Sequence, residues 1–413
     1  MRVVLISGVY PPEPVTSAST SYSLAAGLAQ RGHDVTVIAS FPNRPGGRVF
    51  PGFRRRLLPQ REMDDGIEVV RCYSTISRIS TLLSRLAQNV SFGISSGLAF
   101  SSVRRPDAIY ANTWPLFAAG IASCVARIRH VPLVLSIQDV YPESLIAFKK
   151  LRVGACSSRL LRWLDAAIAR TAAAVVVISR GAEDIYLNDR GVEPAKIHRI
   201  PNWREIEDRP APESGARQRT IWGIGADVFL IVFAGSVVAA CGIESVIRAV
   251  SELGEESSAG LVIAGSGSAL ENCRSIAAMD QRQRVKFTGP FPVQDTLSIL
   301  SAADVLILPT QGDQSLVAMP SKLISYMMSA RPVLAIARLE SDLAAVVKDS
   351  GCGWVIPPED SAALEEQLTL IATLGRPELA RIGASGREYA LAHFSTEACL
   401  PRLVGVIEGV ARQ

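Results

Sequence analysis

Short, continuous apolar runs that alternate with helical patterns constrain the fold of this chain more than any other feature. The first half has such runs at residues 2–7, 34–40, 67–73, 107–111, 132–137 and 174–179, and the second half at 227–235, 261–267, 285–290, 304–309 and 332–336. Strands that are apolar on both faces are typical of parallel sheets covered by helices on both sides. The sequence therefore predicts an α/β fold with two doubly wound parallel sheets, one in each half, that face each other across a cleft.

The length of 413 residues also favours two domains. Residues 205–219 are polar and rich in proline and charge, so we interpret them as the linker between the halves. This predicts a first domain at 1–204 and a second domain at 205–385. The helical pattern near the end predicts that residues 386–413 cross back to the first domain.

Composition excludes several classes of protein. No apolar run reaches the 18 or more residues of a transmembrane helix, and the apolar start lacks a cleavage site, so it is interpreted as a strand. The seven cysteines have no close spacing, which favours reduced thiols in the cytoplasm and argues against a zinc site. We expect neither a metal nor a cofactor.

Charge is unevenly distributed along the chain. Residues 1–200 carry 25 Lys and Arg against 14 Asp and Glu, which leaves +11, whereas the remainder carries 18 and 25, which leaves −7. The first half has a long arginine-rich loop at 41–66 and a weakly polar helix at 82–105. Both patterns are consistent with an anionic membrane surface, and the alternatives are a solvated loop and a helix packed in the core.

Polar residues follow several strands of the first half. Asn112 and Trp114 follow one strand, and Asp139 and Glu143 follow the next. Because ligands of open α/β sheets bind beyond the carboxyl ends of strands, these residues are expected to line one cleft. The alternative for Asp139 and Glu143 is a structural role in turns. The hydroxyl-rich stretch 16–21 is either a phosphate site or an ordinary helix cap.

The stretch 310–332 is the strongest candidate site in the second half. A polar loop follows a buried strand, and residues 319–322 (MPSK) are predicted to open a helix. The free amides of a first helical turn favour an anion, and Lys322 adds a full positive charge. The alternative is an ordinary helix start with a solvated lysine.

Taken together, these motifs resemble the family 4 retaining glycosyltransferases of the GT-B fold, and in particular the bacterial fucosyl and N-acetylfucosaminyl transferases of colanic-acid and O-antigen synthesis. The matching stretches are SGVYPPEPVTSAS, GHDVTVIASFPNRPGGRVFPGFR, QDVYPES, IPNW, FAGSV, IAGSGSAL, VKFTGPF, MPSKLISYMMSARPVLA, SGCGWVIPPED and HFSTEA. Their order and spacing cover nearly the whole chain.

The resemblance implies a transferase that moves a sugar, with retention and without a metal, from a UDP- or GDP-linked donor. The acceptor would be a glycan or an undecaprenyl-diphosphate-linked sugar at the cytoplasmic face of the membrane, with no nucleic acid involved. It implies catalytic roles for Asp139 and Glu143, and acceptor contacts from Glu13, Ser17, Asn112 and Trp114. The implied donor-binding residues are Gly235, Ser236, Gly265, Ser266, Gly289, Phe291, Met319, Ser321, Lys322 and Ser325.

The sequence departs from the family at the donor site. Members usually carry Gly and then Lys or Arg after the first glycine loop, where this chain has Val238 and Ala239. The helix after PSK usually carries a Glu that contacts ribose, where this chain has Ser325. Lys322, Arg338 or a basic residue of the first domain would compensate for the missing cation. The alternatives are a GT-B subunit that has lost its donor site and acts as a non-catalytic partner, a sugar-nucleotide epimerase and, more remotely, a nucleic-acid-binding protein.

Overall fold

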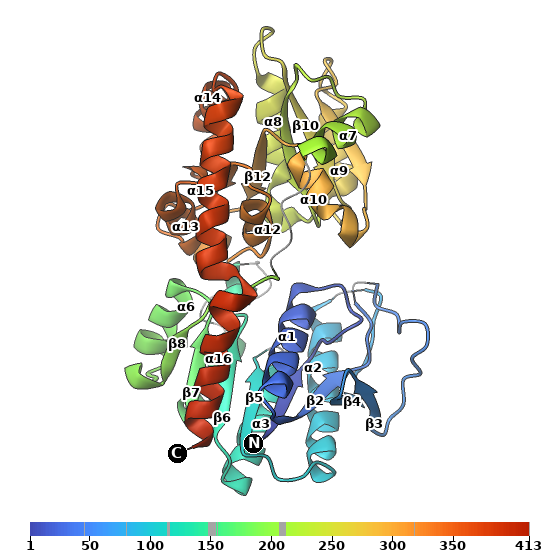
Figure 1. Ribbon diagram of the computed structural model, residues 1–413, viewed down its shortest axis with the longest axis vertical. Helices are drawn as coiled ribbons and strands as arrows, with labels where there is room; N and C mark the ends of the chain where they lie inside the picture. Colours follow the sequence, from blue (N-terminus) through green and yellow to red (C-terminus); the bar gives the residue numbers. More distant parts are fainter. Residues whose placement is uncertain are drawn as a thin grey trace. The chain divides into compact units, whose positions relative to one another are not determined.

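The computed structural model describes residues 1–44, 46–79, 81–113, 116–147, 154, 156–205, 212–317 and 319–412. They form two units (Figure 1). Unit 1 comprises Met1–Arg204 and Thr396–Gln413, and unit 2 comprises Glu205–Ser395. The chain thus returns to unit 1 at Thr396 rather than at residue 386.

The described part of unit 1 is built on an eight-stranded sheet in the order β3-β4-β2-β1-β5-β6-β7-β8. Its strands are β1 Arg2–Ser7, β2 Asp34–Ser40, β3 Gln60–Asp64, β4 Ile67–Cys72, β5 Ala108–Asn112, β6 Leu133–Ile137, β7 Ala174–Val177 and β8 Ile197–Arg199. Its helices are α1 Thr16–Gln30, α2 Leu82–Ser101, α3 Leu116–Arg129, α4 Glu143–Ala147, α5 Cys156–Thr171, α6 Arg180–Asp184 and α16 Thr396–Ala411, with a π-helical turn at Ile185–Asp189 and a 3₁₀ turn at Pro194–Lys196.

Helices cover both faces of this sheet. One hydrophobic core lies between the sheet and α2, α3 and α5, and a second lies between the sheet and α1 and α16 (Figure 1). Because both faces are buried, β1 is apolar throughout its interior, as a central parallel strand must be. The return helix α16 is tied to α1 and the following turn by Glu408, which pairs with Arg31 and His33, at 2.9 Å in each case.

The described part of unit 2 contains a six-stranded parallel sheet in the order β11-β10-β9-β12-β13-β14. Its strands are β9 Phe229–Ala234, β10 Ala259–Ala264, β11 Val285–Gly289, β12 Val305–Pro309, β13 Val333–Ile336 and β14 Gly353–Ile356. Its helices are α7 Pro212–Trp222, α8 Ile243–Glu252, α9 Leu270–Ala277, α10 Thr296–Ser301, α11 Gln314–Val317, α12 Lys322–Met328, α13 Asp342–Ser350, α14 Ser361–Ala372 and α15 Arg376–Phe394, with 3₁₀ turns at Ala239–Cys241 and Val293–Asp295. The prediction of two doubly wound α/β units is confirmed.

Three local predictions were wrong. Residues 41–66 do not form one loop, because β3 pairs antiparallel with β4 at the edge of the sheet. Strand β14 lies where no strand was predicted. Helix α7 begins inside the predicted linker and is held by Arg219, whose guanidinium pairs with Asp304 at 2.6 Å. Strand β3 and helix α7 are polar, and β14 begins with a glycine and is only partly buried at its first three positions, so none gives the continuous apolar run that identifies a buried strand.

Candidate functional site

Strands β9, β10 and β11 are neighbours in the sheet of unit 2, and a glycine lies at the carboxyl end of each of them. We call these three carboxyl ends, with Gly235, Gly265 and Gly289, the glycine edge. The amide of Gly235 donates to Ala264 O and the amide of Gly265 donates to Gly289 O, both at 2.8 Å. A Cβ atom on Gly265 would lie 1.9 Å from the carbonyl oxygen of Gly235, so only glycine allows the two loops to pack backbone to backbone. The amides of Gly235 and Gly265 are therefore used within the sheet.

The side chain of Lys322 reaches this edge from the start of α12. Its ammonium nitrogen lies 3.3 Å from Ser236 O, 3.9 Å from Cys241 Sγ and 4.1 Å from the centre of the Phe233 ring. Lys322 is half-buried, whereas the alternative interpretation of this helix start has a solvated lysine. Burial lowers its pKa, and nearby Cys241 opposes that shift. A partly desolvated cation at the ends of three strands is suited to hold an anionic group.

Tyr326 fixes the position of this lysine and was not identified from the sequence. Its hydroxyl accepts a hydrogen bond from Ala234 N at 3.0 Å and donates one to Ala234 O at 3.2 Å. Residues four apart on a helix share a face, so the side chains of Lys322 and Tyr326 both point toward the carboxyl end of β9. That spacing is the signal in the sequence that would have identified Tyr326.

The other predicted donor residues occupy different environments. Two are exposed at loop tips, Ser236 and Ser266. Two pack against the hydrophobic core and are partly buried, Phe291 and Met319. Two are half-buried at or in α12, Ser321 and Ser325. The helix itself begins at Lys322, so Pro320 precedes it and does not belong to its first turn.

Arg338 does not supply the missing cation at the glycine edge. Its guanidinium pairs with Asp313 at 2.9 Å and with Glu359 at 3.1 Å. These ion pairs raise its pKa, with the hydrogen bond to Asp313 as the largest cause. Of these two cations of unit 2, Lys322 is therefore the one that lies beside the glycine loops.

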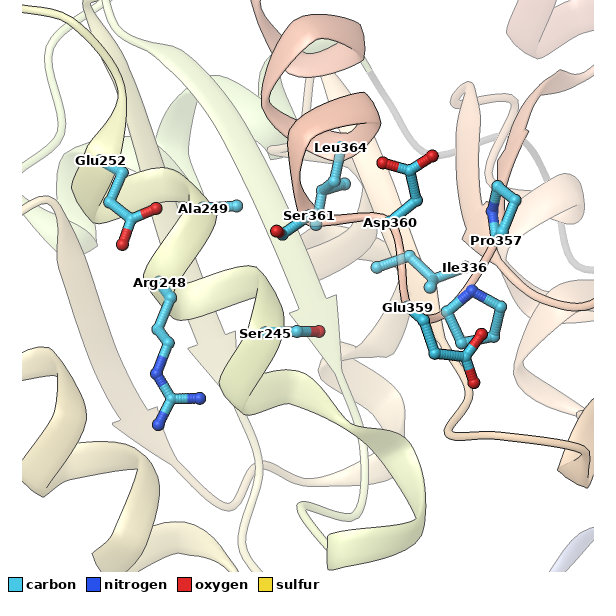
Figure 2. A pocket seen from close by; sticks show the side chains of 11 residues that line it. Ser245, Arg248, Ala249, Glu252, Ile336, Pro357, Glu359, Asp360, Ser361 and Leu364 are labelled. Carbon is cyan, nitrogen blue, oxygen red and sulfur yellow. The ribbon is translucent and has the colours of Figure 1, made fainter.

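A separate pocket of about 280 Å³ opens between α8 and the turn that leads into α14 (Figure 2). Arg248 and Glu252 of α8 and Glu359 and Asp360 of the turn lie around it. None of the predicted donor residues lines this pocket among the residues described. Acidic and basic side chains both line this pocket, whereas the charged side chain described at the glycine edge is the cationic Lys322.

In unit 1, Asp139 follows β6 and is half-buried. Burial raises the pKa of its carboxyl, and the guanidinium groups of Arg85 and Arg44 act in the opposite direction. Tyr141 belongs to the same group, because its raised pKa reflects burial first and the charge of Asp139 second. Asp139, the two arginines and Tyr141 therefore share one electrostatic environment, which the sequence did not reveal.

Glu13 holds one of these arginines in place. Its Oε1 accepts hydrogen bonds from the backbone amides of Asn43 and Arg44, both at 2.8 Å. Its Oε2 is buried with no hydrogen-bond partner among the described residues. Burial raises the pKa of Glu13, and the two amide bonds oppose that shift.

Asn112 and Ser17 belong to a buried network of polar groups at the ends of β1 and β5. Asn112 Nδ2 donates to Ser7 Oγ at 3.1 Å and to Ser21 Oγ at 3.4 Å, and the Ser21 hydroxyl donates to Ser17 O at 2.8 Å. The Oδ1 atom of Asn112 is buried and has no partner among the described residues. The fourth predicted acceptor residue, Trp114, lies outside the described residues.

The contacts of Glu143 are those expected of the structural alternative to its predicted catalytic role. Its Oε2 pairs with Arg190 at 2.5 Å and its Oε1 with Arg162 at 3.1 Å. Arg190 is completely buried and also donates to Asp165 Oδ2 at 2.8 Å and to Tyr141 O at 2.8 Å. Burial alone would lower the pKa of Arg190, but its hydrogen bonds to Asp165 and Glu143 raise it. This buried ion network positions the turn that carries Tyr141.

Two protein-family models match this chain, one in the first half and one in the second. Residues 17–203 match the model of a glycosyl transferase 4-like domain, and residues 228–373 match the model of glycosyl transferases group 1. The first match covers most of unit 1 and the second lies within unit 2.

Relatives and a solved structure agree with these matches. The chain is 28% identical to the probable glycosyltransferase WbjE of Pseudomonas aeruginosa, over 80% of this chain and 82% of that protein. It is 23% identical to the putative colanic acid biosynthesis glycosyl transferase WcaI of Escherichia coli K12, over 98% and 100%. The structure of Anabaena Alr3699/HepE in complex with UDP is similar, with a TM-score of 0.72 and 16% identity over 99% of this chain and 100% of that one.

Two further observations concern membrane and metal binding. Among the described helices, none has the length and apolar character needed to cross a bilayer. In the same residues, no three His, Cys, Asp or Glu side chains lie close enough together to hold a metal ion.

Proposed function

Because the chain belongs to the glycosyltransferases of the GT-B fold, we propose that it transfers a sugar from a nucleotide-sugar donor to a lipid-linked or polysaccharide acceptor. The product would contribute to a bacterial surface polysaccharide. The nucleotide sugar is a substrate in this proposal, and no cofactor or metal takes part. The chain would act at the inner face of the cytoplasmic membrane, where a lipid-linked acceptor is available.

The observation that carries the proposal is the position of Lys322 at the glycine edge of unit 2. An ammonium group that is partly desolvated interacts with a diphosphate more strongly than one in water. Lys322 would take the place of the cation that Ala239 lacks, and it would stabilise the negative charge that develops on the leaving diphosphate. The structure of HepE, which has the same fold, holds UDP, and this supports a UDP-linked donor.

The acceptor would bind to unit 1 beside Asp139. Burial raises the pKa of this carboxyl, which favours the exchange of a proton with a sugar hydroxyl near neutral pH. Arg44 and Arg85 lie in the same environment and would orient an anionic acceptor. Glu13 and Asn112 each keep a buried oxygen without a partner among the described residues, so both remain candidates for contacts with acceptor hydroxyls.

The first experiment is calorimetric titration of the full chain with UDP-, GDP- and dTDP-sugars. We expect one of these donors to bind. Lys322→Met should weaken that binding by roughly 10- to 150-fold, because a hydrogen bond to a charged group contributes about 1.5–3 kcal/mol. The matched control is Lys348→Met, an exposed lysine of α13 in the same unit, which should bind the donor as the original chain does.

Three outcomes would count against the proposal. If no donor binds to a well-folded sample, the donor site is lost and the non-catalytic partner becomes the better interpretation. If Lys322→Met binds the donor unchanged, the lysine does not contact the diphosphate. Asp139→Asn should lower turnover far more than donor affinity, and an equal loss of both would assign Asp139 a structural role.

A further inference from the structure

The outer surface of α2 carries a stripe of exposed apolar side chains. Leu83, Ile94 and Leu98 are 77%, 59% and 58% exposed, and Leu86 lies on the same stripe. Their spacing of three, eight and four residues keeps them on one helical face. The opposite face of α2 is already buried in the core against α3. The stripe is thus a second apolar face, which folding of the described residues leaves uncovered.

A neighbouring loop extends this surface. Leu57 and Leu58 are about three-quarters exposed and follow Arg54, Arg55 and Arg56. The Arg55 guanidinium lies 5.1 Å from the centre of the Tyr73 ring, and the carbonyl of Tyr73 accepts a hydrogen bond from Ser95 of α2 at 2.5 Å. Tyr73 therefore links the arginine-rich loop to α2. We call Leu57, Leu58 and the four α2 residues Leu83, Leu86, Ile94 and Leu98 the docking face.

Positive charge surrounds the docking face and negative charge is scarce. The two segments that form it, residues 41–61 and 73–106, contain ten arginines and no Asp or Glu. Helix α3, which packs against α2, also contains no Asp or Glu. The acidic residue of α5, Asp165, is buried and paired with Arg190. Exposed apolar side chains among arginines match the boundary of a bilayer.

We propose that the docking face binds the surface of an anionic phospholipid bilayer. Acidic headgroups would meet the arginines while the leucines and Ile94 enter the boundary of the acyl chains. Pairing with a second copy of this chain is disfavoured, because a symmetric contact would place two arginine-rich surfaces against each other. The charge pattern therefore selects the lipid surface from the occupants that an apolar stripe alone would allow.

Helix α2 carries both the docking face and a residue of the acceptor side of unit 1. Arg85 lies two residues after Leu83, about 200° around the helix from it, and its charge acts on Asp139. A sugar anchored in the bilayer by a lipid diphosphate would therefore lie near the helix that carries Arg85. This last step depends on the proposed transferase function, whereas the lipid contact itself does not.

The test is co-sedimentation of the full chain with sonicated vesicles of phosphatidylcholine alone and of phosphatidylcholine with 30% phosphatidylglycerol. We expect binding to the anionic vesicles that weakens as salt is added. Ile94→Asp should reduce this binding by about tenfold or more, because it places a charge where an apolar side chain enters the bilayer. Leu370→Asp is the matched control, since Leu370 is 54% exposed on α14 of unit 2, and it should bind within about twofold of the original chain. Both variants should keep the original melting temperature.

Several results would overturn the proposal. These are equal binding to neutral and anionic vesicles, no binding to either, or an unchanged Ile94→Asp variant. Analytical ultracentrifugation that reveals a dimer which Ile94→Asp dissociates would assign the face to a second copy instead. Donor calorimetry on the same samples separates the two proposals. Donor binding without vesicle binding would refute only the proposed lipid contact. Vesicle binding without donor binding would refute only the proposed transferase function.

Discussion

Arg190→Met tests whether the buried ion network of unit 1 is structural. The guanidinium of Arg190 is fully buried and donates to Asp165, to Glu143 and to the carbonyl oxygen of Tyr141. Methionine fills much of the volume but leaves two carboxylates without their common cation. Glu143 retains its ion pair with Arg162, whereas Asp165 keeps, among the residues that the structure describes, only the hydroxyl of Tyr186. We therefore expect a loss of about 3–5 kcal/mol in the free energy of unfolding at neutral pH.

The loss should depend on pH with a defined sign. Burial raises the pKa of Asp165 in the folded protein, and Arg190 opposes that shift. Without Arg190 the folded pKa rises further above the unfolded value of about 3.9, so the folded variant binds a proton more tightly than the unfolded chain does. The stability of the variant therefore falls as pH rises through this window. Its deficit relative to the original chain should be full near pH 8 and should shrink as the pH is lowered.

Urea unfolding combined with hydrogen exchange measures this effect by region. Peptides of α5 and β7 should lose protection in Arg190→Met, while peptides of β9 and β12 in unit 2 should not. Arg162→Met is the matched control, because Arg162 contacts the same Glu143 from the surface and should cost less than about 1 kcal/mol. The reasoning would be refuted by an Arg190→Met variant within about 1 kcal/mol of the original chain, or by equal losses in both variants.

Three further predictions follow from single contacts. Glu143→Gln should lower the melting temperature of unit 1, and any loss of turnover should be recovered at a temperature where the variant is folded; persistent inactivity of a folded sample would restore a catalytic role. Gly265→Ala should destabilise unit 2 by more than about 2 kcal/mol and abolish donor binding, because the new methyl group would collide with a backbone oxygen; normal urea unfolding would show that the loops can separate. Tyr326→Phe should cost about 1–3 kcal/mol of stability and weaken donor binding less than Lys322→Met does, with calorimetry as the measure; an unchanged variant would mean that the ends of β9 and α12 are held by other contacts.

The sequence determined the overall architecture by itself. Buried parallel strands must be apolar on both faces, so the runs at 2–7, 34–40 and 304–309 identified strands without any knowledge of their neighbours. The same pattern could not reveal β3, because an edge strand is partly solvated and its side chains alternate in burial. Glycines and Lys322 marked the candidate donor site because their chemistry is unusual at the ends of strands.

Tertiary structure alone decided what each charged side chain does. Asp139 and Glu143 look equivalent along the chain, four residues apart after one strand, yet Glu143 meets the buried Arg190 and Asp139 does not share that contact. Lys322 meets the carbonyl oxygen of Ser236 across 86 residues of sequence. The role of a carboxylate or an ammonium group depends on the charges and the burial around it. Those neighbours come from distant segments, so only the folded chain could separate the structural carboxylate from the candidate catalytic one.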